Sequence, residues 1–358
     1  MENEIKEILL NLSHSNYKSK FINKKNIKSI LIESDKVEIS IELNFPIALL
    51  SEEFKVLIKN SLEDLVKLPL QINLTQKIKS HQAQKGISLI NGIKNVIAVA
   101  SGKGGVGKSS TAVNIALALL NEGAKVGILD ADIYGPSQPQ MLGIYQKPDS
   151  KDGKSMEPII AHGLQVMSIG FLVDQETPMI WRGPMATSTL EQLLKETNWR
   201  DLDYLIIDLP PGTGDIQLTL AQKIPVTGAI IVTTPQDIAL LDARRGLKMF
   251  EKVNVPIIGI VENMSTHICT NCGHEEHIFG QGGADKMSID YNSHLLGKLP
   301  LDISIREHLD NGTPSVSIDP NNNISKVYQS IAQKVAFKVS ELTEDLGSKF
   351  PKIVIKND

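Results

Sequence analysis

From about residue 95 onward, the chain alternates short apolar runs with longer stretches of helical spacing. The runs are rich in Val and Ile and almost continuously apolar: NVIAVAS, AKVGILDAD, LQVMSIG, LDYLIIDLP, TGAIIVTTP and VPIIGIVEN. Continuous apolar strands, as opposed to alternating ones, are typical of a parallel sheet that crossover helices cover on both faces. The pattern therefore predicts an α/β fold with a mostly parallel sheet, whose ligands bind at the carboxyl ends of the strands.

The first 80 residues follow a different pattern. KVEISIEL and LQINLTQ alternate apolar and polar positions, as half-buried strands do. Between them, SEEFKVLIKNSLEDLVKL has helical spacing and begins with a Ser that would cap the helix. We expect a small α/β domain over residues 1–80, a polar linker over 81–94, a larger domain over 95–345 and a C-terminal tail over 346–358.

Composition and charge narrow the function classes. The 358 residues are 41% hydrophobic and 22% charged, as is ordinary for a soluble globular protein. A net charge of −4 gives no global positive field, so we expect no nucleic acid or membrane partner. The first residues, MENEIKEILLNLSHS, do not resemble a secretory signal, and no apolar run reaches the ~20 residues of a membrane span. These features predict a cytoplasmic protein.

A glycine-rich loop follows the first apolar run. GKGGVGKSS fits G-x-x-x-x-G-K-[ST] and lies between a predicted strand and a predicted helix. Its glycines let backbone N–H groups point at phosphate oxygens, and the helix N-terminus adds partial positive charge. From an expected solvent-facing position, Lys108 would reach the β- and γ-phosphates, while the Ser109 hydroxyl would bind Mg²⁺. The predicted nucleotide-binding residues here are Gly102, Lys103, Gly104, Gly105, Val106, Gly107, Lys108, Ser109 and Ser110.

Carboxylates follow two other predicted strands. Asp130 and Asp132 stand two apart on an extended segment and so share a face, and Asp208 ends the run LDYLIID. An aspartate at a strand end can simply cap the next helix. Three of them at the mouth of one sheet favour a metal–phosphate site, because carboxylate oxygens suit Mg²⁺. Asn263 ends another strand, where its amide can donate and accept at the edge of a base.

The only two cysteines, Cys269 and Cys272, form the motif CTNCG, in which both sulfurs can face one metal. Three arrangements compete. The pair could be a redox couple at a helix start, or a zinc knuckle completed by His274 and His277. Alternatively, each of two identical subunits could supply two of the four thiolates that a [4Fe–4S] cluster needs. The spacing leaves the three arrangements open, and a dimer would favour the shared cluster.

Taken together, the motifs resemble a known family. KGGVGKSS, with a lysine directly after the first glycine, resembles the deviant phosphate loop of nitrogenase iron protein, of septum-placing and chromosome-partitioning ATPases and of Mrp/ApbC iron–sulfur carriers. Over about residues 94–340 the chain resembles the Mrp/ApbC carriers in particular. The motifs that carry this resemblance are GKGGVGKSS, DADIYGPSQP, WRGPM, DLPPGTGD, TTPQDIALLDARRG and ENMS…CTNC. Many family members begin with a small domain that carries a cysteine, whereas residues 1–80 contain none.

The resemblance implies a role for each site residue. Lys103 would reach across a nucleotide-sandwich dimer to the partner's phosphates, and Asp132 would orient the attacking water during hydrolysis. Asp130 and Asp208 would lie near Mg²⁺ and contact it through water. Asn263 would contact the adenine of ATP.

The function implied by the resemblance is that of a homodimeric, slowly hydrolysing P-loop ATPase. It would carry a [4Fe–4S] cluster on Cys269 and Cys272 of both subunits and pass it to apo iron–sulfur proteins. Two alternatives remain: a positioning ATPase of the same superfamily that acts at a membrane or on DNA, and a zinc-binding metallochaperone or scaffold. Arg182, in WRGPM, is a further candidate contact for a phosphate or a partner.

Overall fold

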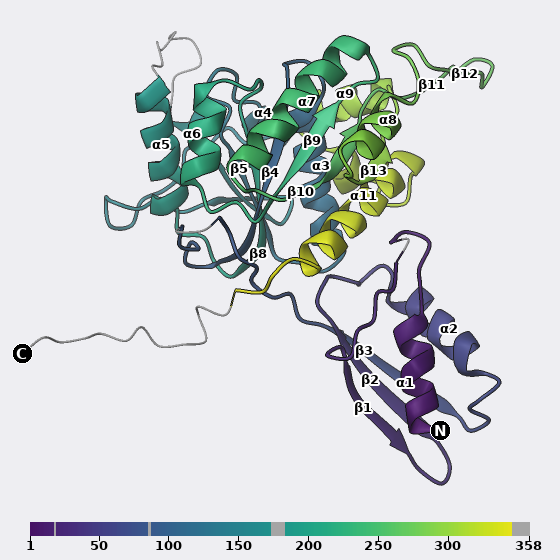
Figure 1. Ribbon diagram of the computed structural model, residues 1–358. Helices are drawn as coiled ribbons and strands as arrows, with labels where there is room; N and C mark the ends of the chain where they lie inside the picture. The colour runs from purple at the N-terminus through teal and green to yellow at the C-terminus, as the bar shows by residue number, and fades with distance from the viewer. Residues whose placement is uncertain (18, 85–86, 173–182, 346–358) are drawn as a thin grey trace, which may run out of the picture.

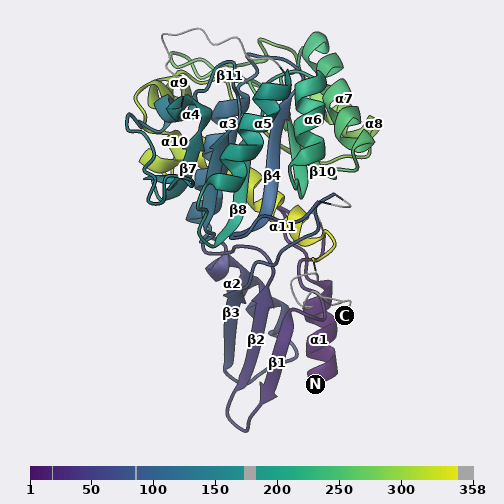
Figure 2. The same ribbon diagram turned by 90° about the vertical axis from the view of Figure 1, so that its left-hand side faces the viewer.

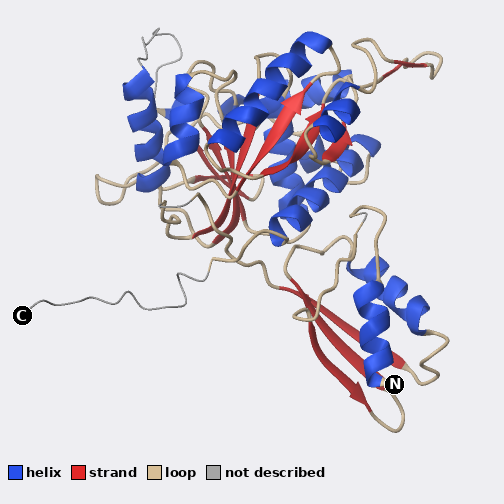
Figure 3. Cartoon of the chain, viewed as in Figure 1, coloured by secondary structure: helices blue, strands red, loops and turns tan. Residues whose placement is uncertain are grey.

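The computed structural model describes residues 1–17, 19–84, 87–172 and 183–345. The chain forms a small N-terminal unit and a larger unit built around a long sheet (Figures 1 and 3). The predicted tail over 346–358 and Arg182 lie outside the described residues. Within the described ranges, no helix has the length and apolar character needed to cross a membrane.

The N-terminal unit is a three-stranded sheet with two helices. Its elements are α1 (Glu2–Asn11), β1 (Ile27–Ile32), β2 (Val37–Leu43), α2 (Ser51–Leu62) and β3 (Leu70–Gln76). In β2 every second residue is buried, as its alternating sequence predicts. The β2 strand pairs antiparallel with β1 and parallel with β3, because α2 crosses between β2 and β3. Ser51 does not cap α2: it is the first helical residue, after Leu50 at the cap position.

The larger unit contains an eight-stranded sheet in the order β13-β10-β9-β4-β8-β5-β7-β6. All its neighbouring strands run parallel except β6, which pairs antiparallel with β7. This arrangement confirms the predicted mostly parallel α/β sheet. The strands are β4 (Ile93–Ser101), β5 (Val126–Asp130), β6 (Ile159–Ala161), β7 (Leu164–Ser168), β8 (Leu202–Asp208), β9 (Gly228–Thr233), β10 (Ile257–Glu262) and β13 (Leu295–Lys298).

Helices cover both faces of this sheet, so the central strands are buried along their length. Helices α5, α6 and α7 form one layer, and α3 and α11 pack together on the other side (Figures 1 and 2). Every residue of β5, β8 and β9 is buried.

The helices of the larger unit are α3 (Lys108–Asn121), α4 (Gln138–Met141), α5 (Gly183–Glu196), α6 (Asp215–Lys223), α7 (Asp237–Lys252), α8 (Gly283–Asp290), α9 (Ile303–Asp310), α10 (Ser315–Ile318) and α11 (Asn323–Ser340), with a 3₁₀ turn at Ile169–Phe171.

The polar stretch between the two units is fixed to the larger one. The backbone N–H and one ring nitrogen of His81 contact the side-chain oxygen of Asn95 in β4. Gln84 is also buried: its amide donates to the Ala221 carbonyl and accepts from the Val226 N–H. Apolar spacing gives no sign of this, because the segment is held by polar side chains.

The N-terminal unit contacts the far end of α3. The Glu122 carboxylate accepts hydrogen bonds from the Leu49 N–H and the Gln333 amide, and the Glu122 carbonyl accepts one from the Ala48 N–H. The Tyr17 ring stacks on Phe337 of α11, with ring centroids 4.3 Å apart. Buried polar and aromatic contacts therefore join the two units.

Candidate nucleotide, metal and thiolate sites

The phosphate loop joins β4 to α3 at the carboxyl edge of the sheet. Gly105 and Gly107 have φ values of +80° and +78°, which glycine adopts without the steric cost that a side chain would bring. A Cβ on Gly102 would lie 2.2 Å from the backbone of Asp242 in α7. The glycines of the motif therefore have two structural roles. Gly105 and Gly107 allow a left-handed backbone, and Gly102 allows α7 to pack closely against the loop.

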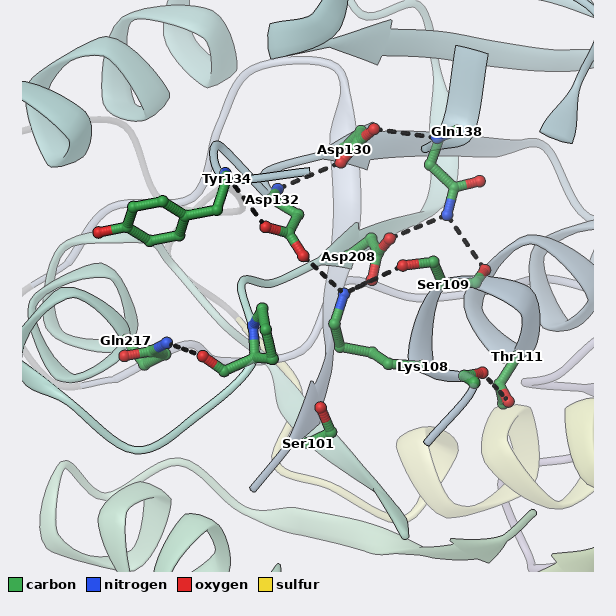
Figure 4. Close-up of polar contacts among 12 residues, drawn as sticks. Ser101, Lys108, Ser109, Thr111, Asp130, Asp132, Tyr134, Gln138, Asp208 and Gln217 are labelled. Atoms are coloured by element: carbon green, nitrogen blue, oxygen red, sulfur yellow. Dashed lines mark hydrogen bonds and ion pairs between the residues drawn. The ribbon is translucent and has the colours of Figure 1, made fainter. Parts of the chain in front are cut away.

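Lys108 is not solvent-facing, which corrects the expectation from sequence. Its residue is only 6% exposed, and its Nζ forms an ion pair with Asp208 at the end of β8. The same Nζ lies 3.2 Å from the Ser109 hydroxyl oxygen and 3.8 Å from Asp132 Oδ2 (Figure 4). The carboxylates at the strand ends draw the ammonium inward, where it balances their charge.

Asp130 serves as the anchor of the loop that carries Asp132. Its Oδ1 accepts from the Asp132 N–H, and its Oδ2 accepts from the Gln138 N–H and the Ser168 hydroxyl. Burial and the nearby charge of Asp208 raise the pKa of Asp130 to about 7. Since both oxygens already have donors, the described contacts give Asp130 a role in holding the loop. Its expected water-mediated contact with Mg²⁺ remains a prediction.

Asp132 faces Lys108 across the site. It is buried, and its Oδ1 accepts a hydrogen bond from the Tyr134 N–H at 3.3 Å. Burial raises the pKa of Asp132, an effect that the positive charge of Lys108 partly offsets. Its second oxygen points toward the lysine and the phosphate loop (Figure 4).

The residues around Lys108 fit a magnesium ion. Ser109 supplies a hydroxyl and Asp208 a fully buried carboxylate, and both contact the lysine ammonium. Hard oxygen ligands of this type suit Mg²⁺, and their contacts with the Lys108 ammonium show that both groups can lie beside a cation. Sequence reasoning missed Gln138, whose side-chain amide donates to Asp208 Oδ2 at 2.9 Å and to the Ser109 carbonyl at 3.1 Å. Its only signal was its place within DADIYGPSQP.

Asn263 contacts the phosphate loop directly. Its Nδ2 donates to the Val106 carbonyl at 2.9 Å, and a Cβ on Gly107 would lie 2.1 Å from that nitrogen. The contact holds the loop to the end of β10, and the adenine contact of Asn263 remains a prediction. Lys103 is half-buried, and its carbonyl accepts from the Ser101 hydroxyl at 2.9 Å.

The two cysteines lie on a hairpin that projects from the larger unit (Figure 1). The hairpin pairs β11 (His267–Ile268) with β12 (Glu275–Glu276). Cys269 is half-buried and Cys272 is exposed. Hydrogen bonds from the backbone N–H groups of Cys272 and Asn271 lower the pKa of Cys269, which favours the thiolate form that binds metals.

The surroundings of the pair bear on the three alternatives from sequence. Cys269 and Cys272 lie at a hairpin tip and not at a helix start, unlike the thioredoxin-type redox pair. The ring of His277 bonds the Ser265 carbonyl at 3.0 Å. Among the described residues, no group of three or more Cys, His, Asp or Glu side chains is placed to share one metal. One hairpin therefore offers two thiolates and no completed site.

Comparison with known proteins gives a consistent family. The family model for the NUBPL iron-transfer P-loop NTPase, within the ParA group, matches residues 92–336. An iron–sulfur cluster carrier protein of Salmonella typhimurium is 53% identical over 92% of this chain and 89% of its own length. The carrier of Escherichia coli K12 is 62% identical over 74% of this chain and 72% of its own. The mouse iron–sulfur cluster transfer protein NUBPL is 49% identical over 71% of this chain and 81% of its own length.

Solved structures agree on the fold. A nucleotide-binding protein of Archaeoglobus fulgidus in complex with ADP matches with a TM-score of 0.55 and 37% identity, over 62% of this chain and 88% of that one. The cell-division ATPase MinD of Pyrococcus furiosus matches with a TM-score of 0.51 and 21% identity, over 67% of this chain and 98% of that one. At this level of identity the match is evidence for the fold alone. With the family model covering most of the chain and its relatives near or above half identity, the chain belongs to the NUBPL iron-transfer P-loop NTPases, the family of iron–sulfur cluster carrier proteins.

Proposed function

We propose that the protein binds a [4Fe–4S] cluster between two identical subunits and passes it to apo-proteins, with transfer coupled to ATP binding and slow hydrolysis. The observation that carries the proposal is the hairpin that presents Cys269 and Cys272 away from the body of the larger unit. One chain offers two thiolates and a [4Fe–4S] cluster takes four, so a two-fold axis through the hairpins completes the site.

The nucleotide half of the proposal follows from the phosphate loop. Loop N–H groups and the start of α3 would hold the phosphates of ATP, and Lys108 would turn from Asp208 to the β- and γ-phosphates. Ser109 and Asp208 would then hold Mg²⁺, which neutralises charge on those phosphates. Asp132 would orient the attacking water through the oxygen that now faces Lys108. Lys103 would supply positive charge to the partner subunit's phosphates.

The working form in this proposal is a cytoplasmic homodimer that delivers its cluster to apo iron–sulfur proteins. Two features of the chain support it: a net charge of −4, and a projecting thiolate pair that a recipient protein can approach. Neither feature favours a nucleic acid or a membrane as the partner.

Anaerobic reconstitution with iron and sulfide tests the cluster. We expect about four iron and four sulfide per dimer. Cys269→Ala and Cys272→Ala should lose the cluster and its transfer to an apo-ferredoxin but keep ATP binding, because the phosphate loop is built from other elements. His274→Ala and His277→Ala are the matched controls and should keep the iron. Tight zinc at one per monomer, lost in the histidine variants and never displaced by a cluster, would overturn the proposal.

A further inference from the structure

Gln138 joins the loop that carries Asp132 to the residues that would hold magnesium. The residue is fully buried at the start of α4. Its backbone N–H is bonded to Asp130, which also holds the Asp132 N–H. Its side chain crosses to Asp208 at the end of β8 and to Ser109 at the start of α3 (Figure 4). One residue therefore contacts three of the segments that form the site.

The direction of the side-chain amide is fixed by its partners. Asp208 Oδ2 and the Ser109 carbonyl oxygen are both acceptors, and both lie within hydrogen-bond distance of the same atom. Only the NH₂ group can satisfy two acceptors, so this atom is the donor nitrogen. The amide oxygen on the other side is buried without a hydrogen-bond partner among the described residues. A buried acceptor left unpaired costs free energy, which the paired nitrogen must offset.

The two oxygens of Asp208 consequently have different partners. Oδ2 takes the Gln138 amide, and Oδ1 takes Lys108. When Lys108 turns to the phosphates, Oδ1 loses its cation while Oδ2 stays bound. The carboxylate then cannot rotate freely, because rotation would break the bond to the amide. Oδ1 remains turned toward the position that the lysine ammonium has left.

We propose that Gln138 is a positioning residue for the magnesium of the bound nucleotide: its amide NH₂ fixes the Asp208 carboxylate and the Ser109 backbone so that Asp208 Oδ1 and the Ser109 hydroxyl face the metal. The inference rests on the nucleotide and Mg²⁺ binding of the proposed function. Groups that orient metal ligands typically change metal affinity about 10–100-fold when they are removed.

The test is binding of Mn²⁺ to the ADP complex of the full chain, followed by electron paramagnetic resonance. Gln138→Met keeps the length of the side chain but removes the donor, and the dissociation constant for Mn²⁺ should rise about 10–100-fold. Gln138→Asn keeps an amide that is one methylene too short to span both acceptors, and should give a smaller loss. Gln140 lies in the same helix and is exposed, so Gln140→Met and Gln140→Asn are the matched controls.

A second measurement separates positioning from general damage. Binding of fluorescent ADP in excess EDTA should fall far less in Gln138→Met than Mn²⁺ binding does and should be unchanged in Gln140→Met, because the Gln138 amide bonds the carbonyl of Ser109 and not an N–H group of the loop. A Gln138→Met protein that binds Mn²⁺ like wild type overturns the inference. Equal losses of Mn²⁺ and metal-free ADP binding also overturn it, since they indicate a distorted site. Wild-type protein that binds no Mn²⁺–ADP would instead defeat the nucleotide half of the proposed function.

Discussion

Replacing Lys108 with methionine should destabilise the ligand-free protein, apart from any effect on chemistry. The lysine is 6% exposed and paired with the fully buried Asp208, and the Asp130 carboxyl lies beside that pair. Removing the cation leaves Asp208 buried without its counter-charge, and breaking a buried pair from one side costs about 3–5 kcal/mol. At about 2–4 °C per kcal/mol for a domain of this size, the Tm should fall by roughly 6–20 °C.

A double-variant cycle assigns that loss to the ion pair. Lys108→Met combined with Asp208→Asn replaces both charges with neutral side chains of similar size, so the double variant should return to within about 1–2 kcal/mol of wild type. Lys103→Met is the control. Lys103 lies in the same loop but takes part in no ion pair within the described ranges, so its Tm should stay close to that of wild type.

Thermal unfolding is followed by circular dichroism in EDTA without nucleotide, so that no metal or phosphate alters the charge balance. The loss of Tm in Lys108→Met relative to wild type should be smaller at pH 5.5 than at pH 8. Because the folded pKa of Asp130 is raised to about 7, the folded state takes up a proton there as the pH falls, and repulsion between the carboxylates decreases. A Lys108→Met protein that melts with wild type, or a double variant no more stable than the single, would refute the reasoning.

Two further predictions concern the loop and the contact between the units. Gly107→Ala should weaken ATP binding more than Gly105→Ala: both need a left-handed backbone that costs alanine about 1–2 kcal/mol, but only at Gly107 would the Cβ also displace the Asn263 amide. Calorimetric titration that gives equal losses would contradict this. Burial raises the pKa of Glu122, so the stability contributed there falls as the pH rises above about 4.5. Glu122→Gln should therefore lose less Tm than wild type between pH 5 and 8, and parallel Tm–pH curves would show the prediction to be wrong.

The sheet could be predicted because burial on both faces leaves a local mark. Residues 202–208, LDYLIID, are buried along the whole of β8, and no alternating pattern could have arisen there. The phosphate loop is also local, since its turn geometry depends on glycines within one short segment. The antiparallel pairing of β6 leaves no comparable mark, because a three-residue edge strand is too short to show a period.

The charge balance of the site could not be predicted in the same way. Lys108 and Asp208 are separated by 100 residues, and Gln138 and Asp208 by 70. A phosphate-loop lysine appears solvated in the sequence because its own neighbours are small and polar. Its burial depends on which strand ends lie next to the loop in the folded sheet, and on how many carboxylates those ends carry. Spacing identified candidate residues at the loop and the strand ends but not Gln138, and it did not show which side chains pair with one another.

Coupling between the nucleotide and the cluster requires a physical connection between two sites that lie on different elements. In the proposed function, the segment that follows β10 would provide one. At the end of β10 Asn263 bonds the phosphate-loop carbonyl of Val106, and six residues further along the chain is Cys269. Between them, the Ser265 N–H bonds the Leu299 carbonyl and the Ser265 carbonyl bonds the His277 ring, so this segment is held at Ser265. In the proposed function, a phosphate that shifted the loop would strain the Asn263 bond, and we expect that change to reach the base of the hairpin through this short stretch of backbone. A nucleotide-gated release of the cluster would need a link of this kind, because a long free linker would not transmit the change.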